Sequence, residues 1–97
     1  MRYSLHPEAR EDLWEAAQFY QANASNELVQ ALFAEFERSV NLLLQYPALG
    51  SLWRSGRRRL LMRRFPYSLI YRIVGEEIRV LAVAHHSRRP GYWRGRK

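Results

Sequence analysis

The residues best suited to chemistry are gathered in segment 85–97, directly after an apolar stretch, Ile78–Val83, that is typical of a buried strand. Two imidazoles come first, at His85 and His86, and histidine is the side chain whose ordinary pKa lies nearest neutrality. Guanidinium, phenol and indole groups follow around a Pro-Gly pair: Arg88, Arg89, Tyr92, Trp93 and Arg94. Arginine binds phosphate through paired hydrogen bonds, and aromatic rings offer platforms to bases or to a partner protein. The segment therefore predicts a catalytic or binding surface.

Charge is divided unequally between the two halves of the chain. Residues 1–50 carry three Arg against seven Asp and Glu, a net charge of −4, and residues 51–97 carry thirteen Arg and Lys against two Glu, a net charge of +11; together they give the +7 of the chain. Such a one-sided basic field attracts nucleic acid, an acidic protein segment or an anionic membrane. General solubility is the simpler explanation, but it does not require the charges to be segregated.

Length and composition indicate one folded domain, residues 1–97, that ends in a basic tail, residues 85–97. Hydrophobic residues make up 47% and aromatic residues 13% of the chain, which argues against disorder. Cysteine is absent, so the chain has no disulfides and no thiolate metal site. The first residues turn polar too early for a signal peptide, and no apolar run approaches the ~20 residues that span a bilayer. We therefore expect a cytoplasmic protein that does not bind a membrane.

Apolar residues at helical spacing predict two helices in the first half of the chain. A short strand within Arg2–His6 comes first, and Pro7 with the acidic residues after it suits the first turn of a helix. Trp14 lies beside the apolar face of this helix, and we expect it in the core. Ser25 suits the N-cap of a second helix, which ends at Tyr46-Pro47. The apolar stripe of the second helix consists of Val29, Leu32, Phe33, Phe36, Val40, Leu43 and Leu44.

The second half is rich in β-branched, aromatic and aliphatic residues, and it predicts three strands: Arg59–Arg63, Tyr67–Val74 and Ile78–Ala84. Simple alternation in the last strand places Ile78, Val80, Ala82 and Ala84 on one face, and Arg79, Leu81, Val83 and His85 on the other. The predicted fold is therefore α+β, in the order β-α-α-β-β-β, with an antiparallel sheet and an αα-hairpin packed on one of its faces.

Several segments of the chain, in this order, resemble the RelE/ParE superfamily of bacterial toxins from type II toxin–antitoxin modules. The resemblance covers nearly the whole chain. Its segments are Leu5-His6-Pro7-Glu8-Ala9 with Asp12-Leu13, Arg64-Phe65-Pro66-Tyr67 leading into Ile70-Tyr71-Arg72, Ile78–Val83 leading into His85, and Arg88–Trp93. The tail looks more like the ParE branch, which is often labelled plasmid stabilisation protein.

The resemblance implies a small basic toxin that a cognate antitoxin with an acidic C-terminal segment holds inactive. RelE-like members cleave messenger RNA on the ribosome, whereas ParE-like members block DNA gyrase and are not nucleases. We expect gyrase as the target, with a ribosome-dependent ribonuclease as the alternative. A plain nucleic-acid-binding domain is the least favoured reading, because no helix-turn-helix or RNA-binding signature is present and both predicted helices are acidic.

A ribonuclease would need an acid, a base and cations near the reacting phosphate. The candidates are His85 and His86 for proton transfer, Arg72 and Arg88 for charge, and Tyr92 for stacking on a base. RelE-like nucleases often take a glutamate or a lysine from the middle strands, but this chain has no Asp or Glu between Arg38 and Gly75, and its only lysine is Lys97. That departure from the family pattern disfavours the nuclease.

A gyrase inhibitor needs a contact surface instead of proton transfer. The candidate contact residues are Arg59, Arg63, Arg88, Arg89, Tyr92, Trp93 and Arg94. The antitoxin's acidic residues are expected to meet the basic stretch Arg57–Arg64.

The two neighbouring imidazoles are expected to point to opposite faces of the last strand, so that only one of them faces a ligand. Neither a metal nor a cofactor is expected. His6 is the only other imidazole of the chain, and no spacing of histidines and carboxylates suggests metal ligands.

Overall fold

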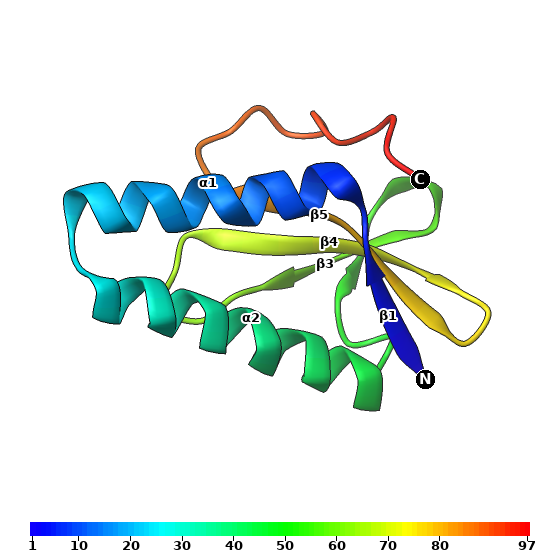
Figure 1. Ribbon diagram of the computed structural model, residues 1–97. Coiled ribbons are helices and arrows are strands. Elements are labelled where there is room, and N and C mark those ends of the chain that lie inside the picture. Colours follow the sequence, from blue (N-terminus) through cyan, green and yellow to red (C-terminus); the bar gives the residue numbers. More distant parts are fainter.

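Five strands form one mixed sheet in the computed structural model, which describes residues 1–97, and two helices cover one of its faces (Figure 1). The helices are α1 (Pro7–Asn23) and α2 (Asn26–Gln45), and a 3₁₀ turn, η1, spans Arg54–Gly56. The strands are β1 (Arg2–Leu5), β2 (Ser51–Leu52), β3 (Arg57–Leu61), β4 (Tyr67–Val74) and β5 (Glu77–His85), arranged in the order β1-β5-β4-β3-β2. The predicted α+β class and the helical hairpin on one face are confirmed. Neither helix is long and apolar enough to cross a membrane.

The sheet differs from the prediction at its two edges. β1 runs parallel to β5, with Arg2 opposite Glu77 and Leu5 opposite Val80, so the sheet is mixed and not wholly antiparallel. A parallel pair needs a long crossover connection, and here everything between β1 and β5 supplies it. The other edge strand, β2, was not predicted, because two residues are too few to show a strand pattern.

Side-chain caps fix the starts of both helices. The Nδ1 atom of His6 accepts a hydrogen bond from the backbone N–H of Glu8 at 3.0 Å, just before Pro7 opens α1. Ser25 is the N-cap of α2, as predicted, and its hydroxyl accepts from the N–H of Leu28 at 3.2 Å. The short break between Asn23, where α1 ends, and Asn26, where α2 begins, leaves the two helices as neighbours on the same sheet face (Figure 1).

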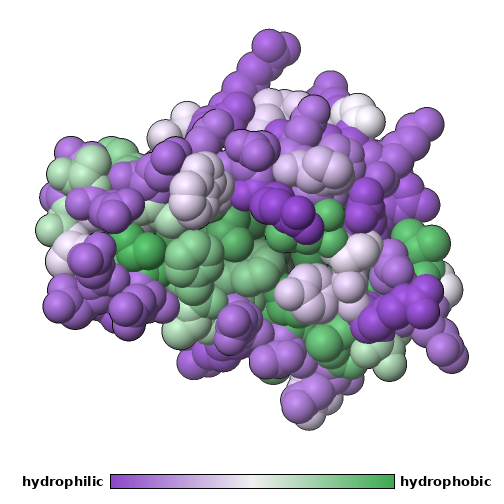
Figure 2. All heavy atoms as spheres, in the orientation of Figure 1, coloured by the Kyte–Doolittle hydropathy of each residue, from purple (hydrophilic) through white to green (hydrophobic).

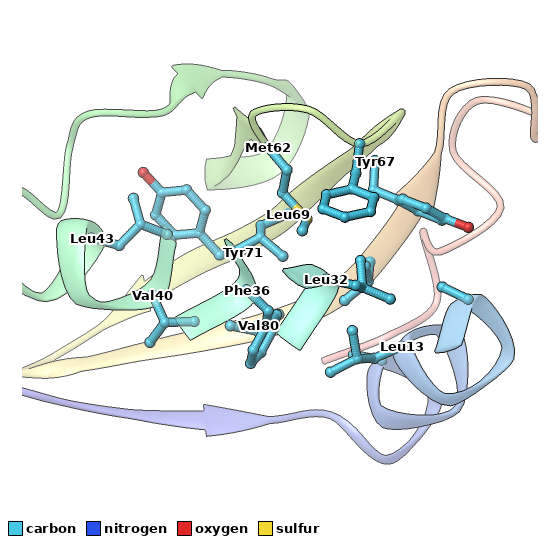
Figure 3. Close-up of a cluster of buried hydrophobic side chains, with 14 of the residues drawn as sticks. Leu13, Leu32, Phe36, Val40, Leu43, Met62, Tyr67, Leu69, Tyr71 and Val80 are labelled. Carbon is cyan, nitrogen blue, oxygen red and sulfur yellow. The ribbon is translucent and has the colours of Figure 1, made fainter. Parts of the chain in front are cut away.

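The core lies between α2 and the sheet (Figure 3). From α2, the central residues of the predicted stripe are buried: Leu32, Phe36, Val40 and Leu43. They share one cluster with side chains from β4 and β5, which include Leu69, Tyr71 and Val80. The burial expected for Phe36 is confirmed, since only 5% of its surface is exposed.

α1 meets the sheet through small residues, namely Ala9, Ala16 and Ala17, together with Leu13. The expectation that Trp14 is in the core is wrong, because 56% of its surface is exposed. One residue beyond Leu13, the helix has turned by about 100°, which carries the indole away from the sheet.

A β-bulge in β5 overturns the predicted alternation of its last residues. Ile70 of β4 is opposite Ala82, but the next residue, Tyr71, is opposite Val80, so Leu81 is an extra residue in β5. As a result, Val83 joins Val80 in the core under the helices, and Ala82 faces the other side of the sheet with Ile70. The bulge therefore sets which way the end of β5 presents its side chains.

Candidate functional site

Beyond the bulge, the outer edge of β5 is completed by a helix and the tail rather than by another strand. β1 ends at Leu5, so the backbone of β5 beyond Val80 has no partner strand on that side. Asp12 of α1 supplies an acceptor in place of a strand: its Oδ2 atom accepts a hydrogen bond from the N–H of Val83 at 3.1 Å. The carbonyl of Leu81 accepts from Nη1 of Arg96 at 3.0 Å. Two backbone groups at and just beyond the bulge thereby have hydrogen-bond partners.

The same carboxylate fastens the tail. Nη1 of Arg96 lies 2.7 Å from Oδ2 of Asp12, and the two side chains are only 10% and 6% exposed. The hydroxyl of Tyr92 donates to the same oxygen at 3.2 Å, and Nε of Arg96 donates to Glu8 at 2.8 Å. Tyr92 also carries the guanidinium of Arg88 over its ring, 3.8 Å from the centroid. These contacts hold the segment Arg88–Lys97 against α1 and β5 (Figure 1).

The pKa values of the fastening groups follow from this environment. Burial by itself would lower the pKa of Arg96, but the hydrogen bond and the charge of Asp12 outweigh burial, and the pKa is raised. Burial, reinforced by the negative charge of Asp12, raises the pKa of Tyr92 to about 12. Arg96 therefore stays charged and the Tyr92 phenol stays protonated, as a donor, throughout the physiological pH range.

Trp93 anchors the tail to the face of the sheet opposite the helices. Only 4% of its surface is exposed, and it packs in a small cluster with Ile70 and Ala82. Its ring meets that of Trp53 edge to face, with the centroids 4.5 Å apart. Trp93, predicted as a contact residue for gyrase, is thus buried against the protein's own sheet, and its ring supports the tail.

A cavity of about 130 Å³ opens between the tail and this face of the sheet. It brings together most of the residues that the sequence singled out: Arg59, His85, His86, Arg88, Arg89, Tyr92 and Trp93. Ser68, which the sequence analysis did not consider, also lines the cavity. Its wall contains no carboxylate and no lysine, and no cluster of His, Cys, Asp or Glu side chains that could hold a metal ion occurs in the structure.

Both histidines line the cavity, but their rings contact opposite faces of the sheet. His85 stacks edge to face on Tyr67, a core residue under the helices, with the centroids 4.9 Å apart. Its Nδ1 atom accepts from the N–H of Ser87 at 3.0 Å. His86 lies with the cavity on the other face, where its Nε2 atom is 3.0 Å from the hydroxyl of the buried Ser68. Each imidazole therefore has one nitrogen committed to a local hydrogen bond.

Three predicted residues lie away from the cavity. Arg63 follows β3, and its backbone N–H donates to Glu35 of α2 at 2.6 Å. Bonding to Arg38 lowers the pKa of Glu35, so this acceptor remains ionised. Arg94 is exposed, with its guanidinium 5.8 Å from the centroid of the Trp53 ring. Arg72 lies in β4, nearer to the turn that joins β4 to β5.

Comparisons with known proteins agree with this architecture. A family model described as the ParE toxin of the type II toxin–antitoxin system, parDE, matches residues 3–90. Among solved structures, the chain is similar to one from a chromosomal ParDE toxin–antitoxin system of P. aeruginosa, with a TM-score of 0.77 and 24% identity. That match covers 88% of this chain and 95% of the other. No curated protein sequence matches the chain significantly.

Proposed function

The chain belongs to the family of ParE toxins of type II toxin–antitoxin systems, and we propose that it blocks DNA gyrase through a contact surface and not by catalysis. The family leaves the target of this particular chain open. The choice of gyrase depends on the way in which the tail and the cavity use their side chains.

The observation that carries the proposal is that the cavity wall holds no carboxylate and no lysine to act with the two histidines, each of which has one ring nitrogen held by a serine. The hydroxyl of Tyr92 donates to Asp12, and one nitrogen of His86 is held by Ser68. General acid–base catalysis of RNA cleavage needs groups placed to exchange protons with the substrate, and a base is often a carboxylate or an amine. The cavity wall offers neither.

The tail instead presents guanidinium groups on a fixed support. Tyr92, Trp93 and Arg96 hold the backbone, whereas Arg88, Arg89 and Arg94 are exposed. A segment that is ordered before it binds loses less conformational entropy on association. Arginine is also enriched among the residues that dominate protein interfaces. This arrangement favours recognition of a macromolecular target.

The predicted consequence is measured with point variants in the tail. Arg89→Ala combined with Arg94→Ala removes exposed groups and should raise the concentration needed to inhibit gyrase supercoiling by about tenfold or more, as expected when two interface arginines are lost. His85→Ala with His86→Ala should change it by less than about threefold, because these side chains contribute only local packing. Arg10→Ala on α1 removes an exposed charge that forms no side-chain hydrogen bond or ion pair with the tail, and it serves as the control.

Point variants are preferable to a tail deletion, which would also remove the buried Trp93 and the Arg96 partner of Asp12. All variants are compared at equal folded fractions, established by thermal melting. Two results would contradict the proposal: wild-type protein that leaves supercoiling untouched, or tail variants that inhibit as well as the wild type.

One observation keeps the ribosome-dependent ribonuclease as the second candidate. His86, Arg59 and Arg88 line the same cavity, so an imidazole and two cations could meet one phosphate there. A translation-dependent cleavage assay, run beside the supercoiling assay, decides between the two targets. Cleavage of a reporter message that disappears in the variant with both histidines replaced would assign the ribonuclease.

We also propose a cognate antitoxin as the partner, with an acidic C-terminal segment that wraps the helical hairpin and the basic edge of the sheet. Figure 2 shows apolar side chains reaching the surface in the middle of the helical face, with polar side chains above and below them. On this hairpin Tyr20, Val29 and Phe33 are only partly buried. Such a surface suits the apolar side of an amphipathic segment.

The antitoxin proposal predicts a salt-dependent affinity. Exposed arginines of the stretch Arg57–Arg64, which include Arg59, Arg63 and Arg64, would meet the acidic residues of the segment. Calorimetric titration with a peptide of the antitoxin encoded beside the toxin should show an affinity that falls as salt rises, because exposed charge pairs are screened. An affinity that stays constant with salt would contradict the electrostatic part of this proposal.

A further inference from the structure

Three arginines form a row across the sheet, on the face opposite the helices. Arg57 of β3 is directly opposite Arg72 of β4, and Arg72 is directly opposite Arg79 of β5. Tyr71, the neighbour of Arg72, is in the core under the helices, so Arg72 and its cross-strand partners point the other way. Neighbouring strands are about 4.8 Å apart, which spreads the three side chains over about 10 Å.

No member of this row forms an ion pair with an acidic side chain. Arg57 donates to the carbonyls of Arg94 and Arg96, at 3.2 and 3.0 Å, and its buried Nε atom has no partner. Arg79 donates to the hydroxyl of Ser4 at 3.1 Å and to the main-chain oxygen of Lys97 at 3.3 Å.

The guanidinium of Arg72, in the centre of the row, makes no hydrogen bond and no ion pair within the protein, and the residue is partly exposed. The acidic side chain closest to the row along β5, Glu77, is engaged with Arg2 and Ser4. Like charges directly opposite one another destabilise a sheet. Because the fold keeps three arginine side chains side by side and the central one, Arg72, has no partner, an anion bound there would relieve their repulsion.

The chemistry of the row favours phosphate groups. All three members are arginines: the guanidinium of Arg72 is free to bind phosphate through paired hydrogen bonds, and those of Arg57 and Arg79, which bond to the tail and to Ser4, add positive charge beside it. They lie on strands, so their spacing is rigid, and the neighbouring tail adds the exposed cations Arg89 and Arg94 to the same side of the molecule. An extended basic face is the electrostatic footprint of a nucleic-acid backbone.

We propose that Arg57, Arg72 and Arg79 form a binding site for the phosphate backbone of duplex DNA. This inference rests on the proposed function, because a toxin that binds gyrase acts beside the duplex DNA that is the substrate of gyrase. The row then adds a sequence-independent, salt-sensitive contact to the contact between the two proteins.

The test is direct binding of the purified toxin to a short fluorescent DNA duplex, followed by anisotropy over a series of salt concentrations. Arg72→Gln is the informative variant, because Arg72 supports no other part of the structure. It should weaken binding about three- to tenfold and lower the slope of log affinity against log salt by about one. Arg10→Gln removes the same charge from exposed α1 and should leave both quantities unchanged.

The outcomes separate this inference from the proposal about gyrase. If Arg72→Gln binds the duplex as tightly as Arg10→Gln, the site is not a DNA site. If Arg72→Gln loses affinity for the antitoxin peptide but keeps its affinity for DNA, the row binds the antitoxin and the inference is overturned. Binding that depends on Arg72 in a toxin that does not inhibit gyrase would retain the DNA site and overturn the gyrase proposal instead.

Discussion

Asp12→Ala should lower the free energy of unfolding by about 3–5 kcal/mol, the usual cost of removing one partner from a buried ion pair. The variant leaves the guanidinium of Arg96, which is 10% exposed, without its main counter-charge. It also removes the acceptor of the Val83 N–H and of the Tyr92 hydroxyl. Domains of this size are stable by about 5–15 kcal/mol, so equilibrium unfolding in denaturant will show the loss clearly.

Glu11→Ala is the matched control for Asp12→Ala. Glu11 precedes Asp12 on the same helix and carries the same charge, but it is exposed, and its replacement should change stability by no more than about 0.5 kcal/mol. The double variant Asp12→Ala with Arg96→Ala should cost clearly less than the sum of the two single variants, since no buried charge is then left unpaired. Equal stabilities of the Asp12→Ala and Glu11→Ala proteins would show that Asp12 does not fasten the tail.

The role of Asp12 illustrates which part of the site the sequence could not predict. A local signal existed, because Asp12 comes three residues after Ala9 and four before Ala16, and this spacing places an acid on the buried face of α1. Its main partner, Arg96, is 84 residues further along the chain. No local pattern connects residues so far apart, so the pair emerges only from the path of the tail over the folded sheet.

The residue types of the tail, in contrast, were informative on their own. Histidine, arginine and aromatic groups after an apolar strand predicted a site at the end of β5, and most of them do line one cavity. The sequence did not predict which tail residues pack on the protein and which remain exposed to a target, because Tyr92 and Trp93 suit either role equally well. The structure buries Trp93, which is 4% exposed, and leaves Tyr92 partly exposed in the cavity wall with its hydroxyl bonded to Asp12.

The fold was predictable wherever the pattern is long. The apolar stripe of α2 and the hairpin of β4 and β5 were recognised correctly, because each repeats its period several times. The bulge at Leu81 was not, because Leu81, Ala82 and Val83 are all apolar and fit either face of the strand. The parallel pairing of β1 with β5 depends on the long crossover between them, which no short segment encodes.

Phe36→Ala should cost about 3–5 kcal/mol of the free energy of unfolding, as expected for a phenylalanine truncated in a packed core. Phe36 is 5% exposed in the middle of α2, and it lies in the same cluster as Val40 and Val80 (Figure 3). Its removal leaves a cavity between the helix and the sheet that alanine cannot fill. The measurement is again equilibrium unfolding, with circular dichroism to show that the variant retains its helices.

Phe33 offers the matched control, because it has the same side chain on the same helix but is only partly buried at the margin of the cluster. Phe33→Ala loses less buried area, so its loss of stability should be clearly smaller than that of Phe36→Ala. If the antitoxin covers the helical hairpin, Phe33→Ala should weaken the antitoxin complex more than its effect on stability explains, since Phe33 remains accessible to a partner. A melting temperature that hardly changes in Phe36→Ala would mean that the stripe of α2 packs against a partner and not against the sheet.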